Sequence, residues 1–175
     1  MLSIIGIGLG DAEDITVKGL NRVKKSKKVY LECYTSKLSN ASIEQLEQLY
    51  GRKIELVYRE DVEQDVDTIL EEAKQDDIAF LVIGNCFSAT THIDIYLRAK
   101  EKGIDVNVIN NASIMTSIGL TGLSLYKFGR TTTIPQDNEN VKSPYDVYID
   151  NKTKGLHTLF LLDIQIDKEQ KYLMN

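Results

Sequence analysis

The alternation of short β-rich runs with amphipathic helical patterns is the feature that most limits how this chain can fold. Five runs have strand character: LSII (2–5), KVYLE (28–32), KIELV (53–57), IAFLVI (78–83) and DVNVI (105–109). Amphipathic helical patterns lie between them, as in ITVKGLNRVKK and VDTILEEAK. Because the strand runs are largely continuous in apolar residues, they indicate strands buried on both faces. The sequence therefore predicts an α/β fold in which a parallel sheet is flanked by helices.

Several helix ends carry local signals. Thr16 is a candidate N-cap for the first helix. Ser42 and Gln45 have the spacing of a capping box, and Gly51 follows the same helix as a C-terminal stop. A later helix, HIDIYLRAKEKG, is expected to end at Gly103.

The alternation weakens after Tyr126. The segment 131–155 is polar and contains both prolines, which indicates a linker or lid. HTLFLLDIQI (157–166) then predicts one further strand. We therefore expect an N-terminal α/β domain over 1–130, a linker, and the beginning of a truncated second α/β domain over 156–175.

Composition argues against several classes of function. The net charge of −5 disfavours a nucleic-acid partner, and the one basic cluster, KKSKK (24–28), falls where a helix should end. No apolar run approaches the roughly 20 residues that span a bilayer, so no membrane association is expected. The N-terminus lacks a basic region and is interpreted as a strand rather than a signal peptide.

Cys33 and Cys86 show no CxxC spacing, which favours a reducing, cytoplasmic compartment without a disulfide or structural zinc. The two histidines are too few for an obvious metal site.

Three strand ends carry unusual loops: GIGLGD (6–11), GNCFSATTH (84–92) and NNASIM (110–115). In parallel sheets, ligands bind beyond the carboxyl ends of the strands. We therefore expect a ligand site where these loops meet.

The first loop places glycines at Gly6, Gly8 and Gly10, directly after a strand. A dinucleotide-binding fingerprint would need its third glycine at position 11, which is Asp11. Glu32, at the end of the second strand, could serve as the acid that such a fingerprint requires. A dinucleotide loop, another ligand loop and an ordinary tight turn remain open from the pattern alone.

The second loop offers Ser88, Thr90, Thr91 and His92, which form either a hydroxyl-rich ligand shelf or ordinary helix-capping chemistry. His92 comes too early in its helix to be expected in the core, and no acid at fixed spacing supports a Ser–His dyad. Cys86 has no neighbouring base in the sequence, so an inert small residue is the favoured interpretation.

The third loop lies between a strand and a helix start. Free N–H groups there could bind a carboxylate or phosphate. The alternative, favoured from the pattern, is that Asn111 or Ser113 simply caps the helix.

Five segments in order resemble the diphthine synthase family: GIGLGDAEDITVKGL, VYLECYTS, FLVIGNCFSATTHIDIYLRAKEKGI, NNASIMTSIGLTGLSLYKFG and GLHTLFLLDI. The resemblance extends from Met1 to about Ile166, and VYLECYTS and YGRK are more similar to the eukaryotic branch than to the archaeal one. It implies a methyltransferase of the tetrapyrrole-methylase fold that binds S-adenosyl-L-methionine (AdoMet) between two α/β domains and releases S-adenosyl-L-homocysteine (AdoHcy).

The resemblance also implies a substrate and an assembly. Family members methylate the amino group of the 3-carboxy-3-aminopropyl histidine on translation elongation factor 2, during diphthamide synthesis, and the eukaryotic enzymes add a further methyl as a carboxyl ester. They are typically homodimers. A homodimer is expected here too, because an incomplete second domain leaves apolar surface that needs cover.

Carried over residue by residue, the resemblance implies a set of AdoMet contacts and no metal ligand or identified catalytic side chain. The contacts are Leu9, Asn85, Ser88, Ser113, Ile114 and Leu162. The glycine loop is then an AdoMet loop, which accounts for a third glycine that misses the dinucleotide spacing.

One departure from the family pattern concerns the shelf. Where members usually have GDPFGATTH, this chain has GNCFSATTH, so that Asn85, Cys86 and Ser88 replace Asp, Pro and Gly. On this basis we expect that the shelf lacks a carboxylate and that Asn85→Asp raises AdoMet affinity. This departure and a second one, the near absence of the family's second domain, motivate an alternative: a non-catalytic protein of this fold with weakened cofactor binding.

Overall fold

The computed structural model describes residues 1–38, 40–59, 66–166 and 172–173. The chain forms two compact units, Met1–Met115 and Thr116–Asn175, and each is described by itself.

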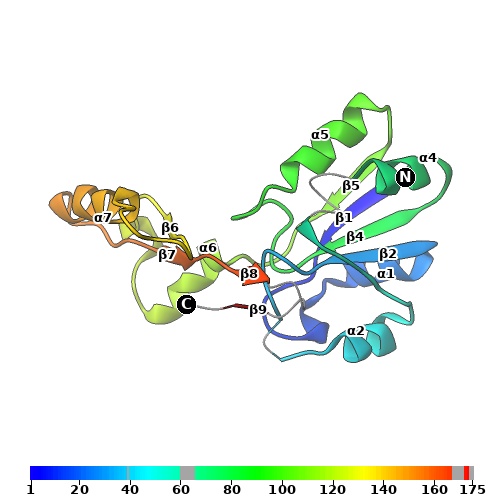
Figure 1. Ribbon diagram of the computed structural model, residues 1–175. Coiled ribbons are helices and arrows are strands. Elements are labelled where there is room, and N and C mark those ends of the chain that lie inside the picture. The colour runs from blue at the N-terminus through cyan, green and yellow to red at the C-terminus, as the bar shows by residue number, and fades with distance from the viewer. Residues whose placement is uncertain (39, 60–65, 167–171, 174–175) are drawn as a thin grey trace. The chain divides into compact units, whose positions relative to one another are not determined.

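The first unit is built on a five-stranded sheet with the order β3-β2-β4-β1-β5, in which every pairing is parallel (Figure 1). Its strands are β1 (Leu2–Gly6), β2 (Lys28–Glu32), β3 (Glu55–Val57), β4 (Ile78–Val82) and β5 (Val106–Ile109). The central strand β4 and its neighbour β1 are buried along their whole length, as the continuous apolar runs predict. The predicted α/β fold with a parallel sheet flanked by helices is confirmed.

Helices cover both faces of this sheet, α1 and α2 on one and α4 and α5 on the other (Figure 1). Their bounds are α1 (Val17–Lys25), α2 (Ile43–Tyr50), α4 (Val66–Gln75) and α5 (Ile93–Glu101), preceded by a 3₁₀ helix at Ala12–Asp14. A short helix, α6 (Ile114–Ser117), crosses the boundary between the two units.

None of the helices in the described part of the chain has the length and apolar character that crossing a bilayer would require.

The predicted helix ends are confirmed. Thr16 caps α1 by accepting a hydrogen bond from the N–H of Gly19. Ser42 and Gln45 form a complete capping box, and α2 ends at Gly51, which has a φ of 65°. These local signals fix where the helices begin and end, and therefore where the loops at the carboxyl ends of the strands start.

The second unit is smaller and contains two short sheets. In the first, β6 (Thr132–Ile134) pairs in parallel with β7 (Phe160–Leu162). In the second, β8 (Gln165–Ile166) pairs antiparallel with β9 (Tyr172–Leu173). The helix α7 (Ser143–Thr153) connects β6 to β7, and two 3₁₀ turns precede them at Ile118–Thr121 and Leu125–Lys127.

Two expectations about this unit are wrong. The segment 131–155, interpreted as a linker, contains β6 and α7. Pro144 lies in the first turn of α7, where a backbone N–H would have no partner within the helix, so the N–H that proline lacks is not missed. The single strand expected over 157–166 is two strands, because the chain leaves the ladder at Asp163, whose carboxylate accepts a hydrogen bond from the N–H of Gln136 at 3.4 Å.

Candidate functional site

The ends of β1 and β4 are joined directly by two glycines. Gly84 N–H donates to the carbonyl of Gly8 at 2.7 Å, and Gly8 N–H donates back to Gly84 at 3.3 Å. The φ angles of Gly8 and Gly84 are 85° and 81°, which side chains rarely tolerate. The first two loops are therefore held together through their backbones.

Larger side chains in place of these glycines would also collide with neighbouring atoms. A Cβ on Gly6 would lie 2.5 Å from the carbonyl oxygen of Gly84 and 3.0 Å from the Cβ of Asn111. A Cβ on Gly8 would overlap the side chain of Asp14. Glycine is therefore needed at both positions for the loops to pack closely against one another.

Asp14 closes the glycine loop. Its Oδ2 accepts hydrogen bonds from the N–H groups of Leu9, at 3.2 Å, and Gly10, at 2.7 Å. Sequence reasoning missed this residue. The only signal was an acid four residues after the last glycine of the loop, and the neighbouring Asp11 makes only a local cap to Glu13 at 2.9 Å.

Asn111 joins the third loop to the first. Its Nδ2 donates to the carbonyl oxygens of Gly6 at 3.0 Å and Asp14 at 2.9 Å, while its Oδ1 accepts from the N–H of Ala112 at 2.7 Å. Asn111 is therefore a bridge between loops. The capping role belongs to Ser113, whose Oγ accepts from the N–H of Met115 at 3.0 Å.

Asn85 joins the second loop to the third. Its Nδ2 donates to the carbonyl of Asn111 at 3.0 Å and to the Oδ1 of Asn110 at 3.4 Å. Its Oδ1 accepts from the N–H of Phe87 and from the hydroxyl of Ser88, each at 3.2 Å. Two of the three residues that depart from the family pattern are thus bonded to each other.

Cys86, the third departing residue, is completely buried. Its thiol lies 3.2 Å from the carbonyl oxygen of Ile109, and burial raises its pKa to about 11. A protonated thiol without a neighbouring base is a poor nucleophile, so the structure favours the inert role predicted for it.

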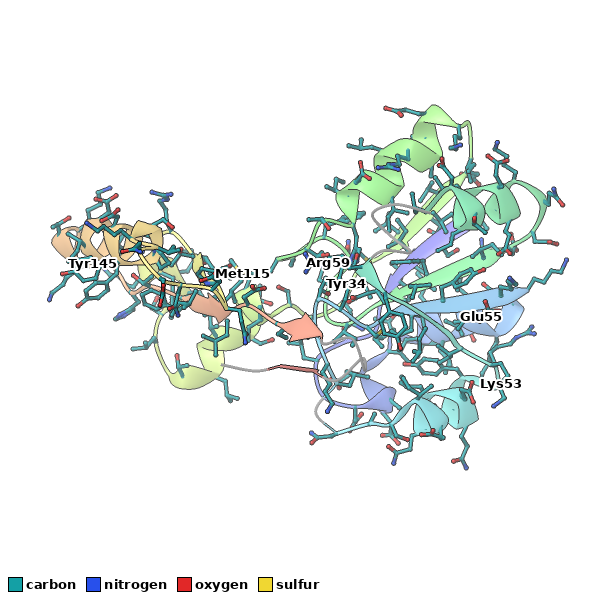
Figure 2. All side chains as sticks on the ribbon, viewed as in Figure 1. Tyr34, Lys53, Glu55, Arg59, Met115 and Tyr145 are labelled. Atoms are coloured by element: carbon teal, nitrogen blue, oxygen red, sulfur yellow. The ribbon has the colours of Figure 1, made fainter. Side chains whose placement is uncertain are left out.

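His92 lies in the core, contrary to the expectation from its place in the helix. Its Nδ1 is hydrogen-bonded to the hydroxyl of Thr90 at 2.7 Å, and its Nε2 to the hydroxyl of Tyr34 at 3.2 Å. Phe80 packs edge-on against the His92 ring. The guanidinium of Arg59 lies over the ring of Tyr34, 5.5 Å from its centre (Figure 2). Burial lowers the pKa of His92 to about 4, so the ring is neutral at physiological pH and supports the shelf from beneath.

Glu32 is equally buried and already bonded. Its carboxylate accepts from the N–H of Tyr34 at 3.3 Å and from the N–H and hydroxyl of Thr35, at 3.1 and 2.6 Å. Burial raises its pKa despite these bonds. Because this carboxylate is bonded within its own turn, it is not available to a ribose hydroxyl. The main argument for a dinucleotide site is thereby removed.

Five of the six residues implied as AdoMet contacts lie on the loops at the carboxyl edge of the first unit: Leu9, Asn85, Ser88, Ser113 and Ile114. Leu9 lies beside Gly84, since a Cβ there would be 3.2 Å from the Leu9 side chain, and Ile114 is 41% exposed. Leu162 lies on β7 in the second unit, 53% exposed, and is described within that unit only.

The chemistry of this edge fits an adenosine-like ligand with a polar tail. Leu9 and Ile114 offer apolar surface to a base, and the Ser88 hydroxyl, which donates to Asn85, leaves its oxygen as an acceptor. In the described ranges there is no group of three or more His, Cys, Asp or Glu that could hold a metal ion.

Comparison with known proteins agrees with this geometry. The model of the Tetrapyrrole (Corrin/Porphyrin) Methylases family matches residues 1–174. The chain is 47% identical to the diphthine synthase of Methanocaldococcus jannaschii, covering 99% of this chain and 68% of that protein. It is 52% identical to the diphthine methyl ester synthase of Homo sapiens, covering 97% of this chain and 60% of that protein.

A crystal structure of diphthine synthase superposes with a TM-score of 0.87 at 40% identity, over 93% of this chain and 64% of that one. The chain thus spans about three fifths to two thirds of the length of these relatives.

Proposed function

The chain belongs to the tetrapyrrole (corrin/porphyrin) methylase family, and on this premise we propose that it is an AdoMet-dependent methyltransferase of diphthamide synthesis. The observation that supports this most is 47% to 52% identity to diphthine synthases over nearly the whole chain. The proposed substrate is translation elongation factor 2 carrying a 3-carboxy-3-aminopropyl histidine, and the proposed acceptor is its amino group.

The proposed cofactor site is the carboxyl edge of the first unit. AdoMet supplies a methyl group already activated by the sulfonium. Leu9 and Ile114 would pack against the adenosine, and Ser88, Asn85 and Ser113 would contact its polar atoms. In the second unit, Leu162 is the remaining proposed contact.

The ionisable side chains behind these loops are poor candidates for a general base. His92, Glu32 and Cys86 are buried, and His92 and Glu32 have their polar atoms engaged in hydrogen bonds. A neutral amine attacking a sulfonium needs alignment more than proton removal. Positioning of this kind can be worth effective molarities of roughly 10⁵–10⁸ M. The residues named here would therefore act by holding and orienting.

We further propose that the protein is a homodimer located in the cytoplasm, where its protein substrate acts, and that it uses neither nucleic acid nor a membrane as partner. Large apolar side chains in the second unit support an interface there: Leu120 and Tyr126 are 96% and 98% exposed. Analytical ultracentrifugation at micromolar concentration should show a dimer. A well-behaved monomer would contradict this part of the proposal.

The test of the activity is transfer of labelled methyl from AdoMet to elongation factor 2 isolated from cells that stop at the 3-carboxy-3-aminopropyl histidine stage. We expect label on that histidine and none on factor whose histidine is unmodified. Binding of AdoHcy without any transfer would instead favour the alternative, a non-catalytic protein of this fold.

A further inference from the structure

The side-chain amides of Asn85 and Asn111 join the three loops at the carboxyl edge, and we call this pair the amide lock. The Asn111 amide reaches Gly6 at the end of β1, Asp14 in the following 3₁₀ helix, and Ala112 in its own loop. The Asn85 amide reaches the backbone carbonyl of Asn111 itself. Every loop of the candidate site is therefore tied to another through one of these two side chains.

The orientation of the Asn85 amide is fixed by its backbone partners. The N–H of Phe87 can only donate, and the carbonyl of Asn111 can only accept. Oδ1 must therefore face Phe87, and Nδ2 must face Asn111. The hydroxyl of Ser88 donates to the same Oδ1 and strengthens this choice.

With the loops placed as they are in this chain, an ionised carboxylate at position 85 would meet a conflict. An amide presents a donor on one side and an acceptor on the other, whereas an ionised carboxylate presents acceptors on both. At position 85, one carboxylate oxygen would face the carbonyl of Asn111 and the Oδ1 of Asn110, which now accept from Nδ2 at 3.0 and 3.4 Å.

We propose that position 85 is a positioning site that requires a hydrogen-bond donor toward β5, and that the amide lock sets the relative placement of the loops that bind the cofactor. Asn85 is then a matched partner of Asn111 and Ser88, and not the remnant of a lost carboxylate. This reverses the expected effect of Asn85→Asp. The cofactor part of the inference rests on the proposed function, whereas the bonding part does not.

The first arm of the test measures unfolding without any ligand, at several pH values. At pH 8, Asn85→Asp should lower the melting temperature relative to Asn110→Asp, a control that adds the same charge to the adjacent loop where only an acceptor is needed. As the pH falls from 8 toward 5 the gap should close, because the protonated carboxyl can donate to Asn111.

The direction in which pH changes the stability of Asn85→Asp follows from the linkage between protonation and folding. The introduced carboxyl has an unfolded pKa of about 3.9, and the facing oxygens raise it in the folded protein. Stability is therefore retained at low pH and lost as the pH rises through the folded pKa. The other titratable groups around the loops include Asp11, Glu13, Asp14, Glu32, Cys86 and His92. They are the same in both variants, so the difference between the variants isolates position 85.

The second arm measures AdoHcy binding by calorimetry at pH 8. Asn85→Asp should weaken binding about tenfold, the effect of one unmatched, partly buried polar contact, while Asn110→Asp stays within about twofold. Equal melting temperatures of the two variants at pH 8, or tighter AdoHcy binding by Asn85→Asp, would overturn the inference. A parent that binds no AdoHcy, together with the predicted pH-dependent gap in stability, would refute the cofactor and still support the lock.

Discussion

The two ends of the same parallel sheet are held together by different chemistry. At the amino ends of the strands, charged side chains pair across elements: Lys27 with Asp76 and Lys28 with Glu72, both at 2.7 Å. Lys27 is 68% exposed, so its pair lies largely in solvent. At the carboxyl ends, neutral amides and glycine backbones join one loop to another. The carboxylates there, Asp14 and Glu32, accept hydrogen bonds from backbone N–H groups, and among the described residues they form no ion pair like those of the amino edge.

This difference separates stability from binding. Exposed ion pairs contribute about 0–1 kcal/mol each and tolerate substitution. Bonds between backbone groups and fixed amides allow few alternatives, because each partner can act only as donor or only as acceptor. The amino edge should therefore tolerate change, while the carboxyl edge should lose ligand binding when a single contact is altered.

The largest effect is expected from Gly8→Val. A β-branched residue at a φ of 85° is strained by about 1–2 kcal/mol, and its Cβ would also displace Asp14 from the loop. AdoHcy binding should become undetectable by calorimetry. Gly51→Val is the matched control, because Gly51 has a φ of 65° with nothing within 4 Å of a Cβ. It should lower stability and leave affinity unchanged. Normal binding by Gly8→Val would remove the glycine loop from the site.

The second effect concerns His92 and pH. Its pKa is about 4 in the folded protein and about 6.5 when unfolded, so between these values the unfolded chain binds the extra proton. The contribution of neutral His92 to the free energy of unfolding is fully present above about pH 6.5. It falls by about 3 kcal/mol as the pH drops toward 4, since one pKa unit is worth 1.36 kcal/mol. Denaturant unfolding at a series of pH values should show this slope, and His92→Leu should flatten it. An unchanged slope in that variant would mean that other groups cause it.

The third prediction tests the anchor of the glycine loop. Asp14→Ala removes the acceptor for two N–H groups and should weaken AdoHcy binding about tenfold, with a stability loss of about 1–2 kcal/mol. Asp11→Ala removes only a local cap to Glu13 and should cost about 1 kcal/mol of stability with little change in affinity. If the two variants bind AdoHcy equally well, Asp14 does not shape the site.

The smallest effect is expected at the amino edge. Lys27→Met breaks the exposed ion pair with Asp76 and should cost at most about 1 kcal/mol, less at high salt. AdoHcy affinity should not change. A loss of affinity here would show that the two edges of the sheet are coupled, and the comparison between them would fail.

Sequence reasoning reached the parts of the molecule that local signals encode. The periodicity of the strands, the cap at Thr16 and the capping box at Ser42 are read within one element, and all three are confirmed. The expected place of the ligand site followed from a general rule for parallel sheets and from the three loops at the strand ends, and it remains a prediction.

What the sequence could not supply were contacts between distant segments. Asn111 bonds to Gly6, 105 residues away, and no local pattern distinguishes this from helix capping. His92 is buried because Tyr34 and Phe80 close over it, although its position near a helix start suggested exposure. The polar helix α7 was mistaken for a linker, because Pro144 can mark either a loop or the first turn of a helix.

The central claim is that the carboxyl edge of the first unit forms an AdoMet site. Calorimetric titration of the chain with AdoHcy, and in parallel with NAD, tests it most directly. The account predicts saturable binding of AdoHcy and none of NAD, because Glu32 is enclosed by its own turn and the glycine spacing does not fit a dinucleotide. Binding of NAD, or no binding of AdoHcy at millimolar concentration, would contradict it.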